Sequence, residues 1–123
     1  MDYSGIPADL DVISRPTPAG ADTEAAVFRI TQEALTNVAK HASATKVRVT
    51  LTYLDNSLLL DVADNGVGMS GMSPQDGYGL VGMQRRADRV GGRLTIESCP
   101  GSGATINLAV PLARAIASPA AER

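Results

Sequence analysis

Hydrophobic and polar residues follow two different periods along this chain, and each period predicts a different element. Apolar residues recur at spacings of three and four from Asp22 to about His41, which predicts an amphipathic helix with Asp22 or Thr23 as its cap. Alternation over 47–52 then predicts a half-buried strand, and an apolar run over 58–63 predicts its partner across a turn. We therefore expect a helix followed by a hairpin.

The second half of the chain has the same order of patterns. We expect a loop over 65–78, a helix over 80–90, and strands over 93–98 and 104–111. The loop holds four glycines and one proline with little hydrophobic pattern, and loops of this length inside a compact domain are usually functional. Two glycines directly after the helix are expected to end it.

The two ends of the chain differ from this middle. Residues 1–21 hold three prolines and two glycines, so we expect a linker with one short first strand at Leu10–Ile13. Residues 113–123 are rich in alanine without a core pattern, and we expect a disordered tail. We therefore expect the folded domain to comprise residues 22–112. Its order of elements predicts a two-layer α+β sandwich, with helices on one face of a mixed, mostly antiparallel sheet.

Composition narrows the class of protein. At 123 residues the chain is one domain, and because only 3% of residues are aromatic, its core must be aliphatic. The formal net charge is −2 with both signs interspersed, which excludes a basic nucleic-acid footprint. No apolar run approaches the roughly 20 residues that span a bilayer, and no signal peptide is visible. The single cysteine, Cys99, fits a reducing compartment, so we expect a cytoplasmic domain without membrane contact.

The first predicted helix carries a stripe of chemically active residues. Glu33 and Asn37 are four residues apart and share one face, and Lys40 and His41 continue the stripe one turn later. Asparagine is unfavourable inside a helix, but its amide oxygen is a suitable Mg²⁺ ligand when phosphates and water complete the coordination. Glu33 can order water or act as a base, and Lys40 can attract phosphate oxygens. The alternative is a solvated helix face, with the two basic residues near the negative helix end.

Asp64 closes the second predicted strand and is followed by two closely spaced glycines. A carboxylate there can accept a hydrogen bond from an exocyclic amine, which adenine has and guanine lacks at the matching position. Because an unpaired buried carboxylate is costly, this arrangement would favour ATP over GTP. Gly66 and Gly68 let the backbone approach a base closely. The alternative is an Asp-Asn-Gly hairpin turn between two strands.

A second group of glycines precedes the second helix. Gly77, Gly79 and Gly82 lead into its first turn, where free N–H groups and the helix dipole favour an anion. The alternative is a flexible linker. The glycines at 101–103 suit either another glycine loop or a tight hairpin turn. No role is assigned to the three arginines on the flank of this helix, Arg85, Arg86 and Arg89.

Together these segments resemble the nucleotide-binding boxes of sensor histidine kinases, over residues 22–112. The resembling segments are the N box at 32–41, the G1 box at 64–69, the G2 box at 77–83 and a degenerate last glycine box at 101–105. The string Gly-Leu-x-Gly-Met-x-x-Arg followed by Gly-Gly, at 79–92, is similar to a subfamily that signals to LuxR-type DNA-binding response regulators.

The resemblance implies the Bergerat fold, with a flexible lid over Mg²⁺ and ATP. It implies a protein histidine kinase that donates the γ-phosphate of ATP to a histidine on a separate dimerisation domain, upstream of a response regulator. By position, Asn37 would coordinate Mg²⁺, Glu33 would be the polarising acid, and Asp64 would bind the adenine amine. The other residues implied to contact the nucleotide or shape its pocket are Lys40, His41, Gly66, Gly68, Met69, Gly77, Gly79, Leu80, Gly82 and, under the adenine, Thr105.

One departure from the family matters. The only histidine, His41, lies in the N box and is not the phosphoacceptor. The chain therefore resembles a catalytic domain alone, expected to be monomeric and inactive in phosphotransfer without its acceptor domain. Two alternatives stay open: a related ATPase of the same fold, such as a gyrase-type clamp or an anti-sigma serine kinase, and a nucleotide-binding regulatory module without catalysis.

Overall fold

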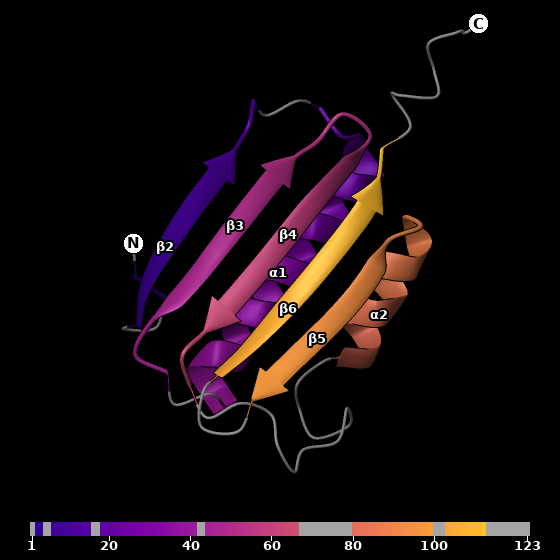
Figure 1. The fold of residues 1–123 in the computed structure, drawn as a ribbon. Coiled ribbons are helices and arrows are strands. Elements are labelled where there is room, and N and C mark those ends of the chain that lie inside the picture. The colour runs from indigo at the N-terminus through magenta and orange to yellow at the C-terminus, as the bar shows by residue number, and fades with distance from the viewer. Residues whose placement is uncertain are drawn as a thin grey trace, which may run out of the picture.

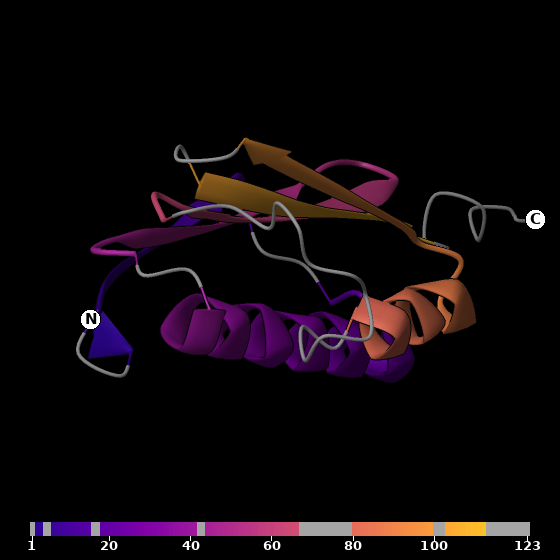
Figure 2. The same cartoon turned by 90° about the horizontal axis from the view of Figure 1, so that it is seen from below.

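The protein folds into two layers, a twisted sheet and a pair of helices that cover one of its faces (Figures 1 and 2). This computed structural model describes residues 2–3, 6–15, 18–41, 44–66, 80–99 and 103–112. Residues 67–78 of the loop predicted at 65–78, residues 100–102 of the turn predicted at 100–103, and the tail predicted at 113–123 lie outside these residues. The predicted α+β sandwich with a mixed sheet and helices on one face is confirmed.

The elements follow one another as the periodicity predicts, with an additional strand at the start. They are β1 (Asp2–Tyr3), β2 (Ile6–Ile13), α1 (Ala21–His41), β3 (Val47–Tyr53), β4 (Ser57–Asp64), α2 (Leu80–Arg89), β5 (Arg93–Cys99) and β6 (Gly103–Pro111). The strand order in the sheet is β1-β2-β3-β4-β6-β5. All neighbouring strands are antiparallel except β2 and β3, which are parallel. None of the helices described is both long and apolar enough to cross a membrane.

The strand predicted at Leu10–Ile13 is longer in the structure, where it is β2. The pattern favours a short strand at Leu10–Ile13, whereas β2 begins at Ile6 and pairs with β3 from Ala8 onward. Parallel strands need a crossover connection, and α1 supplies it in a β2-α1-β3 unit. Pro7 is tolerated because β2 lies near the edge of the sheet, where its neighbour β1 has only two residues.

Helix α1 begins one residue before the predicted cap. The Gly20 carbonyl accepts the first helical bond, from the N–H of Glu24 at 2.9 Å, so Gly20 is the N-cap and the prediction of Asp22 or Thr23 was wrong. The backbone of Gly20 has a φ of +96°, which a residue with a side chain rarely adopts. The Glu24 carboxylate turns back to accept a hydrogen bond from Ala19 N–H at 3.0 Å, and both groups stabilise the first turn.

Helix α2 ends at the predicted pair of glycines. Gly91 has a φ of +70°, and its N–H donates to the Asp88 carbonyl, while Gly92 N–H donates to Ala87 O at 2.8 Å. These two bonds form a Schellman motif, which satisfies the last carbonyls of the helix and turns the chain into β5.

The core lies between the two layers and is aliphatic, as the composition predicts. Alternate residues of β3, β4 and β6 face the helices, and the opposite residues face solvent. The largest fully buried side chains come from both layers: Ile30, Leu60, Met83, Leu108, Val47 and Val110. Burying such side chains contributes about 1.5–3 kcal/mol each relative to exposure. This packing fixes the distance and orientation of both helices over the sheet.

The strand ends near Asp64 and Gly103 approach each other more closely than side chains permit. Gly103 has a φ of +99°, and a Cβ atom on it would lie 2.0 Å from the Asp64 carbonyl oxygen. Only glycine fits this position, because both the backbone conformation and the space exclude a side chain. Gly103 therefore sets where β6 begins relative to the end of β4.

This close approach predicts a large effect of Gly103→Ala on stability. Gly20→Ala is the matched control, because Gly20 has a similar φ but nothing within 4 Å of a built Cβ. We expect Gly20→Ala to lower the free energy of unfolding by about 1–2 kcal/mol through backbone strain alone. Gly103→Ala should lower it by at least about 2 kcal/mol more, through the added overlap. Urea denaturation measures both, and equal losses would contradict the steric argument.

Candidate functional site

Most of the residues implied by the sequence gather at one end of the two-layer structure. The C-terminal end of α1, the end of β4 at Asp64, the start of β6 at Gly103 and the start of α2 at Leu80 all lie there (Figure 1). Segments that are far apart in sequence therefore meet around the space between the helix layer and the sheet.

Asn37 is the one polar residue in the buried set of the described chain, with only 3% of its surface exposed. It lies on the face of α1 that packs on the sheet, one turn after Ala34 and two turns after Ile30. No described residue donates a hydrogen bond to its Oδ1 atom, although Asn37 makes an interaction elsewhere. A solvated helix face is therefore excluded for Asn37. Burying an amide costs free energy that a purely structural apolar residue would not cost.

The other residues of the stripe occupy less buried positions or are not described at side-chain level. Glu33 lies one turn before Asn37 and is half-exposed. Lys40 and His41 form the last turn of α1, at the same end as Asn37, and their side chains lie outside the described structure. The structure thus places the backbone of all four residues on consecutive turns of one helix.

Asp64 is the last residue of β4 and lies on the inner face of the sheet. It pairs with the fully buried Val47 in β3, and paired residues of neighbouring strands share a face. Its Oδ1 atom accepts a hydrogen bond from Gly66 N–H at 2.8 Å, and no described residue donates to Oδ2. The alternative of a tight hairpin turn is wrong, because both antiparallel partners of β4 lie elsewhere in sequence. Asp64 and Asn37 therefore approach the same space from the two layers.

Sequence reasoning missed the role of Asn65. Its Oδ1 accepts hydrogen bonds from the backbone N–H groups of Thr45 and Lys46, both at 3.0 Å, and its Nδ2 donates to Thr45 Oγ1 at 2.9 Å. Its own N–H donates to Lys46 O at 3.3 Å. One side chain thus ties the segment after α1 to the end of β4. The only sequence signal for this bridging role was an asparagine next to Asp64, and an asparagine there is equally typical of a turn.

Thr105 is not brought together with the other candidates. Ala104 and Ile106 are buried on the inner face of β6, so Thr105 between them faces the opposite side of the sheet. It pairs with Ala63 of β4, next to the pair Ile106 and Val62, which faces the core. The side chain on the inner face near Asp64 is the methyl group of Ala104.

The glycine loops are described only at their edges. Gly66, two residues after Asp64, is buried, while Gly68, Met69, Gly77 and Gly79 lie outside the described residues. Leu80 begins α2 and packs against the core, and Gly82 follows on the exposed side of the first turn. Their contribution to a pocket stays a prediction.

A metal ion at this site would need ligands from outside the described side chains. Among the residues described, no three His, Cys, Asp or Glu side chains gather closely enough to hold one. Asn37 offers a neutral amide oxygen, which is a hard ligand of the kind that Mg²⁺ takes together with substrate phosphates and water. Among the described residues, the donor set therefore fits Mg²⁺ whose remaining ligands are phosphate and water oxygens.

Comparison with known proteins identifies the family. The family model described as "Histidine kinase-, DNA gyrase B-, and HSP90-like ATPase" matches residues 22–114. The chain therefore belongs to this ATPase family, as the resemblance of its boxes predicts.

Similar proteins of known name include a histidine kinase and a sensor protein. The chain is 34% identical over 112 residues to the "Signal transduction histidine-protein kinase/phosphatase DegS" of Brevibacillus brevis, covering 90% of this chain and 29% of DegS. It is 42% identical over 87 residues to "Sensor protein VraS" of Staphylococcus aureus, covering 70% of this chain and 25% of VraS. The chain thus spans less than a third of either relative.

The fold matches solved histidine kinases. The blue-light activated histidine kinase of Erythrobacter litoralis EL346 superposes with a TM-score of 0.75 at 21% identity, covering 91% of this chain and 37% of that chain. The catalytic domain of histidine kinase ThkA has a TM-score of 0.68 at 15% identity, covering 89% of this chain and 80% of that chain. At such identities the likeness concerns the fold.

The contacts of Asn65 predict its effect on stability. Asn65→Ala removes three side-chain hydrogen bonds, and because the residue is exposed, water compensates part of the loss. We expect the free energy of unfolding to fall by about 1–2 kcal/mol. Asn65→Asp keeps the acceptor and should lose about half as much. Asn56→Ala, an exposed asparagine in the turn between β3 and β4, should change stability by less than about 0.5 kcal/mol. Equal effects of Asn65→Ala and Asn56→Ala in urea denaturation would refute the role.

Proposed function

We propose that this domain binds Mg-ATP and donates its γ-phosphoryl group to a histidine on a separate dimerisation domain of a two-component sensor kinase. The observation that carries the proposal is the position of two polar groups at one end of the structure. The buried amide of Asn37 and the carboxylate of Asp64 approach the same space from the helix layer and from the inner face of the sheet.

Asp64 is the proposed adenine-binding residue. The Gly66 N–H fixes one carboxylate oxygen, and no described residue occupies the other. That oxygen can accept a hydrogen bond from the exocyclic amine of adenine. The carbonyl of guanine at the matching position would instead face a carboxylate without a donor between them, which is costly when water is excluded. The pocket should therefore select ATP over GTP.

Asn37 is the proposed ligand of Mg²⁺, with phosphate and water oxygens as the remaining ligands. The ion would neutralise the charge that develops on the phosphates during transfer. Glu33, one turn earlier, is proposed to hold the acceptor imidazole or order a water. Lys40, at the end of the same helix, would contribute positive charge toward the phosphates. The glycines at 66–82 are proposed to form the lid and phosphate loop.

The reaction moves the γ-phosphoryl group from ATP to an imidazole nitrogen and releases ADP. A neutral imidazole is already nucleophilic, so positioning and charge neutralisation are the main requirements. His41, the only histidine of the chain, lies in α1 beside the proposed phosphate site and is not the acceptor. The acceptor must therefore come from another domain, and a response regulator is the proposed recipient after it.

Two alternatives are separated by simple assays. A serine kinase or a clamp ATPase of the same family would bind ATP but label a serine-containing partner, or release phosphate, in place of labelling a histidine. A regulatory module would bind ATP and label no acceptor. Neither alternative has a specific structural observation in its favour.

The first prediction of this proposal concerns the base. By calorimetry, the domain should bind Mg-ATP, and Mg-GTP should bind at least about tenfold more weakly. Asp64→Asn should weaken ATP binding by about 10–100-fold, since hydrogen bonds to charged groups contribute about 1.5–3 kcal/mol. Asp61→Asn is the matched control, because Asp61 lies on the same strand but faces the other side and accepts a hydrogen bond from Asn107. Equal losses in the two variants would argue against an adenine contact.

The second prediction concerns the metal. Wild-type protein should bind ATP more tightly with Mg²⁺ than with a chelator, and Asn37→Ala should abolish that difference while still unfolding cooperatively. With an acceptor-histidine domain supplied in trans, Asn37→Ala should lose phosphotransfer by at least about 100-fold. Asn56→Ala should leave both measurements unchanged. Retained phosphotransfer in Asn37→Ala would remove Asn37 from the mechanism.

A further inference from the structure

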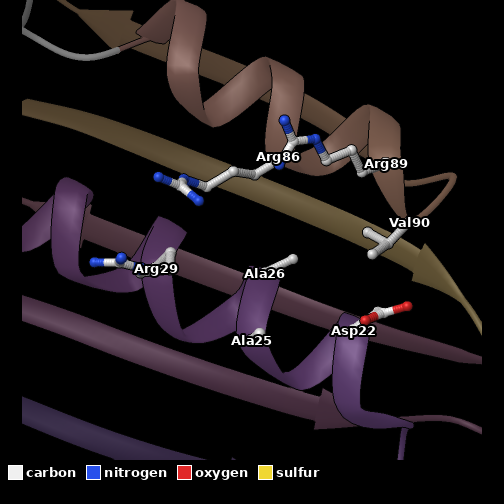
Figure 3. A pocket seen from close by; sticks show the side chains of 7 residues that line it. All are labelled: Asp22, Ala25, Ala26, Arg29, Arg86, Arg89 and Val90. Atoms are coloured by element: carbon white, nitrogen blue, oxygen red, sulfur yellow. The ribbon is translucent and has the colours of Figure 1, made fainter.

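A pocket lies between the start of α1 and the end of α2, away from Asn37. It has a volume of about 360 Å³ and is lined by Asp22, Ala25, Ala26, Arg29, Arg86, Arg89 and Val90. The first four belong to the start of α1, Arg86 and Arg89 to the end of α2, and Val90 follows α2 directly. Figure 3 shows the arginines extending from both helices, with the small side chains of Ala25 and Ala26 on α1. These small side chains leave the space between the helices open.

The lining of this pocket, named here the arginine groove, is strongly positive. Three arginines and one aspartate give it a formal charge of +2, whereas the whole chain has a formal charge of −2. Arg86 is the half-buried member, while Arg29 and Arg89 are exposed. Asp22 offsets only one of the three guanidinium charges, so the pocket keeps a net positive charge that favours an anionic ligand.

These guanidinium groups have no negative partner within the described structure. The ion pairs that the described residues form lie on the opposite face of the sheet, where Asp9 and Asp11 pair with Lys46 and Arg48. Nearby carboxylates make other bonds. Glu24 accepts from Ala19 N–H, and Asp88 accepts from the Gln84 amide at 2.9 Å. None of the ion pairs formed among the described residues involves these three arginines, so their guanidinium groups can bind a ligand.

We propose that the arginine groove docks an acidic segment of a partner protein, with side-chain carboxylates bound by Arg29, Arg86 and Arg89. Arginine binds carboxylates with two parallel hydrogen bonds. A groove between two helices can accommodate a peptide segment that carries several such side chains. A membrane surface fits less well. It would need a broad basic face, whereas the three arginines are confined to one pocket between two helices.

The groove is separate from the proposed nucleotide site. Asp22 and Asn37 are 15 positions apart on α1, which corresponds to about 22 Å along the helix. An acidic partner and ATP can therefore be bound at the same time. Because residues of both helices line the groove, a docked partner also holds the two helices against each other.

The test uses a short fluorescein-labelled glutamate-rich peptide and a glutamine-rich peptide of equal length, with fluorescence anisotropy at near-physiological salt. The glutamate peptide should bind and the glutamine peptide should not. Arg86→Gln combined with Arg89→Gln should weaken binding at least about tenfold. Arg85→Gln is the matched control, because Arg85 lies on the same helix but does not line the groove, and it should change binding less than about twofold. Arg29→Gln tests the groove independently from α1.

Four outcomes would overturn the proposal. The first is an equal loss in Arg85→Gln, which would mean attraction to charge in general. The second is unchanged binding in both Arg29→Gln and the Arg86→Gln, Arg89→Gln variant. The third is tighter binding to phosphatidylserine vesicles than to the peptide, with the same dependence on the arginines. The fourth is displacement of the peptide by inorganic phosphate at equal concentration, which would identify a site for small anions. Continued peptide binding in the presence of saturating Mg-ATP would support a separate site.

Discussion

The packing of α1 across the inner face of the sheet is the interaction on which the rest of this structure depends. The apolar stripe of the helix, with Ile30 and Val38, is buried against alternate residues of β3, β4 and β6. Because a helix repeats every 3.6 residues, the same packing that buries Ile30 also carries Asn37 to the inside. The helix thereby places one amide in an otherwise aliphatic core, which costs free energy.

Local contacts then hold the end of the sheet that carries Asp64. The side chain of Asn65 ties the chain after α1 to the end of β4, and the Gly66 N–H orients the Asp64 carboxylate. Gly103 allows the start of β6 to approach the Asp64 backbone. Each contact joins segments that are distant in sequence or turns the chain sharply. Together they fix where the end of β4 lies relative to the segment after α1 and the start of β6.

The pair of helices has a different chemistry at each end. At one end, α1 carries Asn37 and its polar neighbours while α2 begins after the glycine loop. At the other end, α1 begins with small and charged residues while α2 ends with Arg86 and Arg89. The small side chains of Ala25 and Ala26 open a groove there, whereas Met83 fills the space nearer the core. One layer of the fold thus carries different chemistry at its two ends, a buried amide near one end and a cluster of arginines at the other.

The sequence by itself determined the helices, most strands, the aliphatic core and the family, because these depend on local periodicity and on short motifs. Periods of 3.6 and 2 residues are set by backbone geometry, and the two glycines after α2 predict its Schellman ending. Only the tertiary structure decided which faces meet. It showed that β2 is a full parallel strand, that Asn37 is buried and Thr105 faces away, and that Asn65 bridges two segments. It also brought Arg29 beside Arg86, separated by more than 50 positions in sequence. These are contacts between distant residues, which local patterns do not specify.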